Sequence, residues 1–132
     1  MEFDLDKMYC GIIRRGDIFL FEEGNNPSTS LHYAQGREKA VVVLQEDVLN
    51  QGLPTVVCAS IEPYEKGEEI FPNEVLLKAE ETGLGKNGIC MLHKILTIDR
   101  RNMISKKGEL KVEKLQEIYE ALEINLGRFR DK

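Results

Sequence analysis

The strongest constraint on the fold is a pair of near-continuous apolar runs in the first half of the chain. The runs are "KAVVVLQE" at residues 39–46 and "TVVCASI" at residues 55–61, and the short connection between them contains Gly52 and Pro54. Each run has the length of a strand but lacks the alternation of a strand with one solvated face. We therefore predict two strands that are buried on both faces.

Three further segments have strand character, and a helical pattern closes the chain. The strand segments are "DIFLF", "NEVLLKA" and "GICMLHKILTI", at residues 17–21, 73–79 and 88–98. Across residues 112–126 apolar side chains recur at steps of three and four, and Gly127 follows at a position typical of a helix C-cap. About five strands and one amphipathic helix predict an α+β, mainly β fold, a small curled sheet or barrel with helical cover.

A long polar loop separates the first two predicted strands. Residues 22–38 are rich in Gly, Asn, Pro and Ser, and an irregular loop of this length in a compact domain is usually functional or disordered. The loop contains His32, and Arg37 and Lys39 lie where it meets the second strand. These two cations either solvate the end of a strand or hold a phosphate.

Length and cysteine content favour a single intracellular domain. A chain of 132 residues is long enough to bury a core without disulfides or a metal. Its three cysteines form no CxxC pair, so we expect reduced, buried thiols rather than a metal site or redox pair. The first nine residues are acidic, unlike a signal peptide, and no apolar run has the length of a membrane span. We expect a soluble, cytoplasmic protein.

Charge is distributed unevenly along the chain, whose net charge is -5. Residues 62–81 contain seven acids and two lysines, a net charge of -5, whereas residues 86–107 contain six basic residues and one acid, a net charge of +5. The overall charge argues against a protein covered by nucleic-acid contacts, but a local basic surface for an anionic partner remains compatible with it. Separate solvated faces with no ligand are the alternative.

Five motifs occur in order along the chain: "RRGDIFL", "AQGREKAVVVLQED", "LPTVVCASI", "LHKILTIDRRNM" and a closing helix with "LGR". In their order and spacing the chain resembles the MazF/PemK/Kid family of toxin endoribonucleases, and this resemblance extends over residues 13–128. It implies a single domain over residues 13–130 after a polar tail of residues 1–12, folded as a small SH3-like antiparallel β-barrel with a C-terminal helix. It also implies a homodimer that cuts single-stranded RNA without a metal or other cofactor until a cognate antitoxin blocks the groove.

The resemblance places candidate catalytic residues at positions where this chain departs from the family pattern. Lys39 stands where the family commonly has its catalytic arginine, and Glu62 stands where a hydroxyl residue is common. Metal-free cleavage needs a base for the 2′-hydroxyl, an acid for the leaving 5′ oxygen and positive charge for the phosphorane. We assign the charge to Lys39 and the proton transfers to His32 or Glu62. Alternatively, Glu62 neutralises Lys39 and repels RNA.

The predicted RNA contacts are basic or polar residues in the same motifs. Arg37 is the neighbouring phosphate ligand, and a groove shared with the basic segment would bind RNA or an acidic stretch of antitoxin. The full set of predicted RNA or phosphate ligands is Gln35, Arg37, Thr97, Arg100 and Arg101. For His93 we favour a structural role.

Three classes of function follow from these patterns. The favoured one is an RNA-cutting toxin of a type II toxin–antitoxin system. A non-catalytic relative that binds nucleic acid or an antitoxin is the second. A protein-targeting toxin is the third, because the gyrase-poisoning CcdB toxins are similar in fold to this family.

Overall fold

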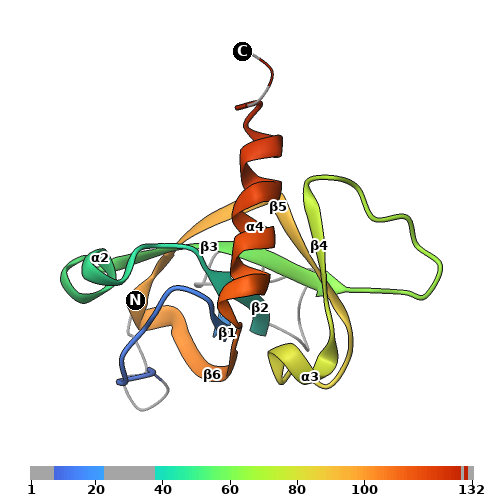
Figure 1. Ribbon diagram of the computed structural model, residues 1–132. Coiled ribbons are helices and arrows are strands. Elements are labelled where there is room, and N and C mark those ends of the chain that lie inside the picture. The colour runs from blue at the N-terminus through green and yellow to red at the C-terminus, as the bar shows by residue number, and fades with distance from the viewer. Residues whose placement is uncertain (1–7, 23–37, 129, 131–132) are drawn as a thin grey trace, which may run out of the picture.

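In the computed structural model, six antiparallel strands form one curled sheet, and α4 (Val112–Asn125) crosses it (Figure 1). The structure describes residues 8–22, 38–128 and 130. Within this part of the chain the strand order is β4-β5-β3-β2-β1-β6. The strands are β1 (Asp17–Glu22), β2 (Glu38–Val43), β3 (Thr55–Pro63), β4 (Glu74–Leu77), β5 (Gly88–Asp99) and β6 (Met103–Glu109). The prediction of a mainly β, α+β fold is confirmed.

The central strand, β2, is buried on both faces, as the sequence predicts. Val42 packs into a core beneath α4, whereas Val41 and Val43 pack into a second core on the opposite face of the sheet. The expected strand at residues 39–46 ends early, because the N–H groups of Leu44 and Gln45 both donate to the carbonyl of Val57. This shared acceptor breaks the regular ladder before the short helix α2 (Asp47–Gly52) begins.

The predicted C-terminal helix is confirmed, and it ends one residue before the expected position. Leu115, Ile118 and Ala121 form the buried face of α4, and the Tyr119 hydroxyl donates to the carbonyl of Leu44 at 2.6 Å. Beyond these contacts the helix projects past the sheet (Figure 1). Gly127 follows it with a φ of 75°, the left-handed conformation expected of a capping glycine.

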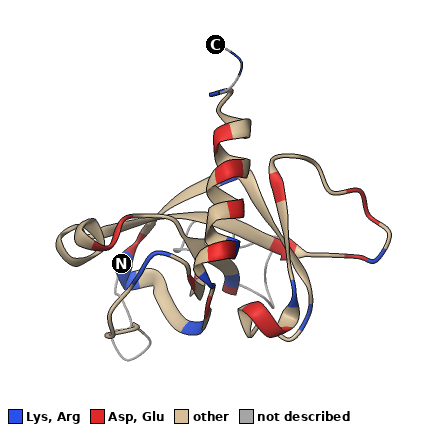
Figure 2. Ribbon diagram, in the orientation of Figure 1, with Lys and Arg blue, Asp and Glu red and all other residues tan. Residues whose placement is uncertain are grey.

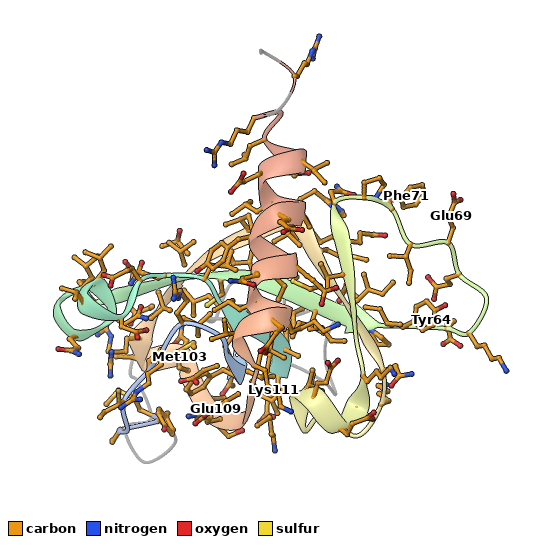
Figure 3. The ribbon with its side chains drawn as sticks, viewed as in Figure 1. Tyr64, Glu69, Phe71, Met103, Glu109 and Lys111 are labelled. Carbon is orange, nitrogen blue, oxygen red and sulfur yellow. The ribbon has the colours of Figure 1, made fainter. Side chains whose placement is uncertain are left out.

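Strand β6 and the short helices were absent from the prediction. Only Met103, at its start, is buried in β6, so this edge strand has almost no apolar pattern. Figure 3 labels Met103 and Glu109, the first and last residues of the strand. Helix α2 occupies an expected connection, and α3 (Ala79–Thr82) begins at the last residue of an expected strand and continues beyond it. A 3₁₀ turn at Arg100–Asn102 joins β5 to β6.

The sheet is open rather than a closed barrel, and its two edges are β4 and β6. The turn after β4 nevertheless packs against β6 through two glycines. A Cβ on Gly83 would overlap the carbonyl oxygen of Lys107, and a Cβ on Gly108 would lie 2.6 Å from that of Thr82. Glycine at both positions therefore permits the backbone contact between α3 and β6.

The described part of the N-terminal segment contacts the sheet. The rings of Tyr9 and Phe19 pack edge to face, with 4.8 Å between their centroids. The backbone N–H of Tyr9 donates to the carbonyl of Met103. The boundaries of a tail at residues 1–12 and a domain at 13–130 stay a prediction. Within the described residues, no helix is long and apolar enough to cross a membrane.

We predict that only one of the three cysteines reacts rapidly with Ellman's reagent at pH 8. Cys10 is exposed, whereas Cys58 and Cys90 are buried, and burial raises the pKa of both buried thiols to about 12. Because the thiolate is the reactive form, neither buried thiol should react until the protein unfolds. Prompt reaction of all three thiols in the absence of denaturant would contradict this burial.

We also predict that Gly83→Ala lowers the free energy of unfolding in urea by at least roughly 1 kcal/mol, because alanine is strained in the left-handed region. Gly83 has a φ of 77°, and its added methyl group would collide with β6. Gly52→Ala is the matched control, since no atom lies within 4 Å of a Cβ placed there. Equal losses in the two variants would contradict the proposed role of the α3–β6 contact.

Candidate functional site

A pocket of about 320 Å³ opens where β2 begins, β3 ends and β5 begins. Strand pairing creates it: Ala40 on β2 is opposite Ile61 on β3, and Pro63 on β3 is opposite Gly88 on β5. The lining residues are Leu20, Glu38, Lys39, Ala40, Ile61, Glu62, Pro63, Leu84, Lys86, Asn87 and Gly88.

Apolar and charged residues both line the pocket. Leu20, Ala40, Ile61 and Leu84 supply apolar surface, and Ile61 belongs to the core beneath α4. A Cβ on Gly88 would lie 2.7 Å from Ile61 Cγ2, so glycine there allows β5 to start close to this apolar surface. The charged lining residues are Glu38, Lys39, Glu62 and Lys86.

Glu62 forms an ion pair with a lysine from β5. Lys94 Nζ lies 3.6 Å from Glu62 Oε1, and both side chains are about half exposed. Lys94 reaches this position from an irregular part of β5, because the register jumps between the pairs Ala59–Ile95 and Ser60–Met91. His93, beside it, is exposed, so the structural role favoured for this histidine is not seen. Such an exposed ion pair contributes little to stability, but it keeps a positive charge beside the Glu62 carboxylate.

Two of the predicted catalytic residues, Lys39 and Glu62, lie together in the pocket. The third, His32, lies outside the described residues, as do Gln35 and Arg37. Their predicted roles stay predictions.

The other three predicted RNA ligands are at the opposite end of β3 from the pocket. Thr97 pairs with Val57, and the strand then ends with Asp99 opposite Thr55. The distance from Thr55 to Ile61 along an extended strand is about 20 Å. The expected single groove beside Lys39, Arg100 and Arg101 is therefore not formed within one chain.

Arg100 and Arg101 are also engaged in other contacts. The Arg100 guanidinium donates to the carbonyl of Asn50 at 2.6 Å and to that of Gly11 at 3.2 Å. Arg101 forms a two-point contact with Asp99, and these hydrogen bonds lower the pKa of the Asp99 carboxyl. Arg100 thus connects the N-terminal segment to α2 and has a structural role.

Sequence reasoning missed Lys86 and Asn87, which line the pocket, and Lys94, which pairs with the lining residue Glu62. Lys86 and Asn87 belong to the segment "ETGLGKNG", which reads as a connection between strands. A polar pair flanked by glycines immediately before a buried strand was the available signal. Lys94 carried none, because its position depends on the register jump in β5. Among the described residues, no group of three His, Cys, Asp or Glu side chains is placed to hold a metal ion.

A family model described as "PemK-like, MazF-like toxin of type II toxin-antitoxin system" matches residues 14–126. The chain belongs to this toxin family. The match includes both Lys39 and Glu62, and it also includes the second region at Thr97, Arg100 and Arg101. The resemblance seen in the sequence is confirmed.

Solved structures similar to this family member share its fold at low sequence identity. An endoribonuclease in complex with its cognate antitoxin from Mycobacterial species has a TM-score of 0.68 at 16% identity, over 87% of this chain and 95% of that one. The Mycobacterium tuberculosis toxin MazF-mt6 has a TM-score of 0.65 at 18% identity, over 83% and 95%. MazE-MazF (Form-III) from Deinococcus radiodurans has a TM-score of 0.67 at 20% identity, over 89% and 98%. The chain therefore has a MazF-like fold.

We predict that Arg100→Ala lowers the free energy of unfolding by roughly 1–3 kcal/mol, the usual cost of removing hydrogen bonds to a charged group. Arg101→Ala is the comparison, because its partner Asp99 stays partly solvated when the guanidinium is removed, so the urea midpoint should fall less than in Arg100→Ala. Urea denaturation followed by circular dichroism measures both. If Arg100→Ala were as stable as the parent, Arg100 would be free for ligand binding after all.

Proposed function

We propose that this MazF-like toxin is a metal-independent endoribonuclease that cleaves single-stranded RNA at the pocket of Lys39 and Glu62. The supporting observation is the convergence of these two residues from β2 and β3 on one pocket. Both residues also stand at catalytic positions of family-like motifs in the sequence. Family membership and the fold shared with a solved endoribonuclease add support.

In the proposed reaction, the 2′-oxygen attacks the adjacent phosphorus and the bond to the 5′ oxygen breaks. The Glu62 carboxylate, whose Oε1 lies 3.6 Å from Lys94 Nζ, accepts the proton of the 2′-hydroxyl. The Lys39 ammonium stabilises the negative charge that develops on the phosphorane oxygens. The leaving 5′ oxygen takes a proton from a general acid, for which His32 is the sequence-based candidate. The products are a 2′,3′-cyclic phosphate and a 5′-hydroxyl.

Lysine at this position has a consequence for rate. A guanidinium binds two phosphoryl oxygens through a planar fork, whereas an ammonium acts as a single point charge. The departure from the family pattern at Lys39 therefore favours a slower enzyme than a chain with arginine there.

We predict that Lys39→Ala reduces the cleavage rate on the order of a hundred- to a thousandfold, as expected when one group that stabilises the transition state is lost. Lys39→Arg should raise the rate above that of the parent. The assay is cleavage of a long single-stranded RNA with EDTA present, with new 5′ ends mapped. Lys66→Ala, which removes an exposed lysine from the β3–β4 loop, is the matched control, and circular dichroism checks folding. Equal cleavage by Lys39→Ala and the parent would place the active site elsewhere.

A non-catalytic function remains the second candidate, and one observation favours it. Glu62 and Glu38 bring two negative charges to the pocket that holds Lys39. These carboxylates repel a phosphate and so weaken its binding in the pocket. A protein that binds RNA or antitoxin without cutting is compatible with this arrangement. RNA binding without new 5′ ends in the same assay would favour this candidate.

We further propose that a cognate antitoxin binds this protein and that the active unit is a cytoplasmic homodimer. The antitoxin proposal draws support from the MazE-MazF structure and the endoribonuclease–antitoxin complex, whose folds resemble this chain. Co-purification with the product of a neighbouring reading frame tests the antitoxin, and light scattering at micromolar concentration tests the dimer.

A further inference from the structure

Two adjacent pocket residues, Lys86 and Asn87, have side-chain groups that no described residue engages. None of the described carboxylates forms an ion pair with Lys86, which is exposed. The Asn87 Oδ1 accepts a hydrogen bond from the Ala79 N–H at 2.9 Å, and its main-chain carbonyl accepts one from the Tyr64 N–H at 3.0 Å. These two bonds hold Asn87 in place and leave its Nδ2 amine as a fixed donor.

The remainder of the pocket suits a nucleobase. Its volume of about 320 Å³ falls in the range of small-ligand sites, which combine apolar walls with a few polar groups that fix orientation. Leu20, Ile61 and Leu84 offer apolar surface to the face of a base. Unpaired bases in single-stranded RNA expose both their faces and their hydrogen-bonding edges, which is how proteins read RNA sequence.

We infer that the pocket holds one unpaired nucleotide of RNA, in which Asn87 reads the base and Lys86 contacts an adjoining phosphate. This inference rests on the proposed function and adds the residue that determines base preference. The Asn87 Nδ2 amine donates to a carbonyl oxygen on the base edge. Uracil presents such oxygens, whereas adenine is read by an amide through a paired contact that also uses the amide oxygen. Because the Asn87 Oδ1 is engaged with the Ala79 N–H, the pocket prefers uracil over adenine.

Two substitutions with the same change in net charge separate the two roles. Asn87→Asp retains the oxygen that accepts from Ala79 but replaces the donor amine with a second acceptor. Lys86→Gln removes one positive charge and leaves Asn87 intact. Each variant changes the net charge by -1, so a purely electrostatic effect would act on both alike. Lys66→Gln makes the same charge change on the exposed β3–β4 loop, outside the pocket residues.

The probes are fluorescein-labelled 12-nucleotide RNAs, U12 and A12, in which 2′-O-methyl groups prevent cleavage. Fluorescence anisotropy gives Kd at several salt concentrations. We expect the parent to bind U12 roughly two- to tenfold more tightly than A12, as for one hydrogen bond. Asn87→Asp should abolish or reverse that ratio. Lys86→Gln should weaken both probes equally and reduce the slope of log Kd against log salt by about 0.7. Lys66→Gln should behave like the parent.

Failure of this inference differs from failure of the proposed function. If Asn87→Asp keeps the parent's ratio of U12 to A12 affinity, or if Lys86→Gln keeps both its affinity and its salt slope, the inference is overturned. In that case Lys39→Ala would still weaken binding if the pocket is the RNA site. A parent protein that binds neither probe would overturn the inference together with the proposed RNA site.

Discussion

Burial of β2 on both faces is the constraint on which the rest of the structure depends. Val41 and Val43 enter one core and Val42 enters the other, so a slip of one residue would exchange both sets between cores of different shape. The register of β2 against β3 is therefore fixed, with Ala40 opposite Ile61. That register places Lys39 and Glu62 side by side at the strand ends, and the pocket follows from it.

The parts of the fold that could be predicted from the sequence are those in which buried apolar residues are consecutive or recur at regular spacing. The two-faced strands and α4 carry strong apolar patterns, whereas β6 is an edge strand with one buried residue, Met103, and carries almost none. The same limit applies to the site. Lys39 and Glu62 lie at the ends of readable strands, but Lys94 reaches Glu62 only through a register jump between β3 and β5. Long-range pairing of this kind leaves no local signal in the sequence.

The basic segment at residues 86–107 does not form one continuous surface. Arg100 donates to main-chain carbonyls, and Arg101 pairs with Asp99. Lys106 Nζ lies 3.3 Å from Oδ1 of the buried Asp17. Burial raises the pKa of Asp17, and the ion pair with Lys106 acts in the opposite direction and partly offsets the desolvation of the carboxylate. Lys86 and Lys94 are the members of the segment that lie at or beside the pocket. Acidic residues meanwhile lie along α4 and on the β3–β4 loop (Figure 2), a surface that would repel RNA and so direct it towards the pocket.

The location of the RNA site is the central claim, and NMR tests it most directly. In a 15.1 kDa chain, backbone amide signals are resolvable residue by residue, and titration with the 2′-O-methyl RNA U12 shows which of them move. We expect the largest shifts at residues 38–40, 61–62 and 84–88, around the pocket. Shifts confined to residues 97–102, with the pocket amides unmoved, would contradict the claim and place RNA at the opposite end of the sheet.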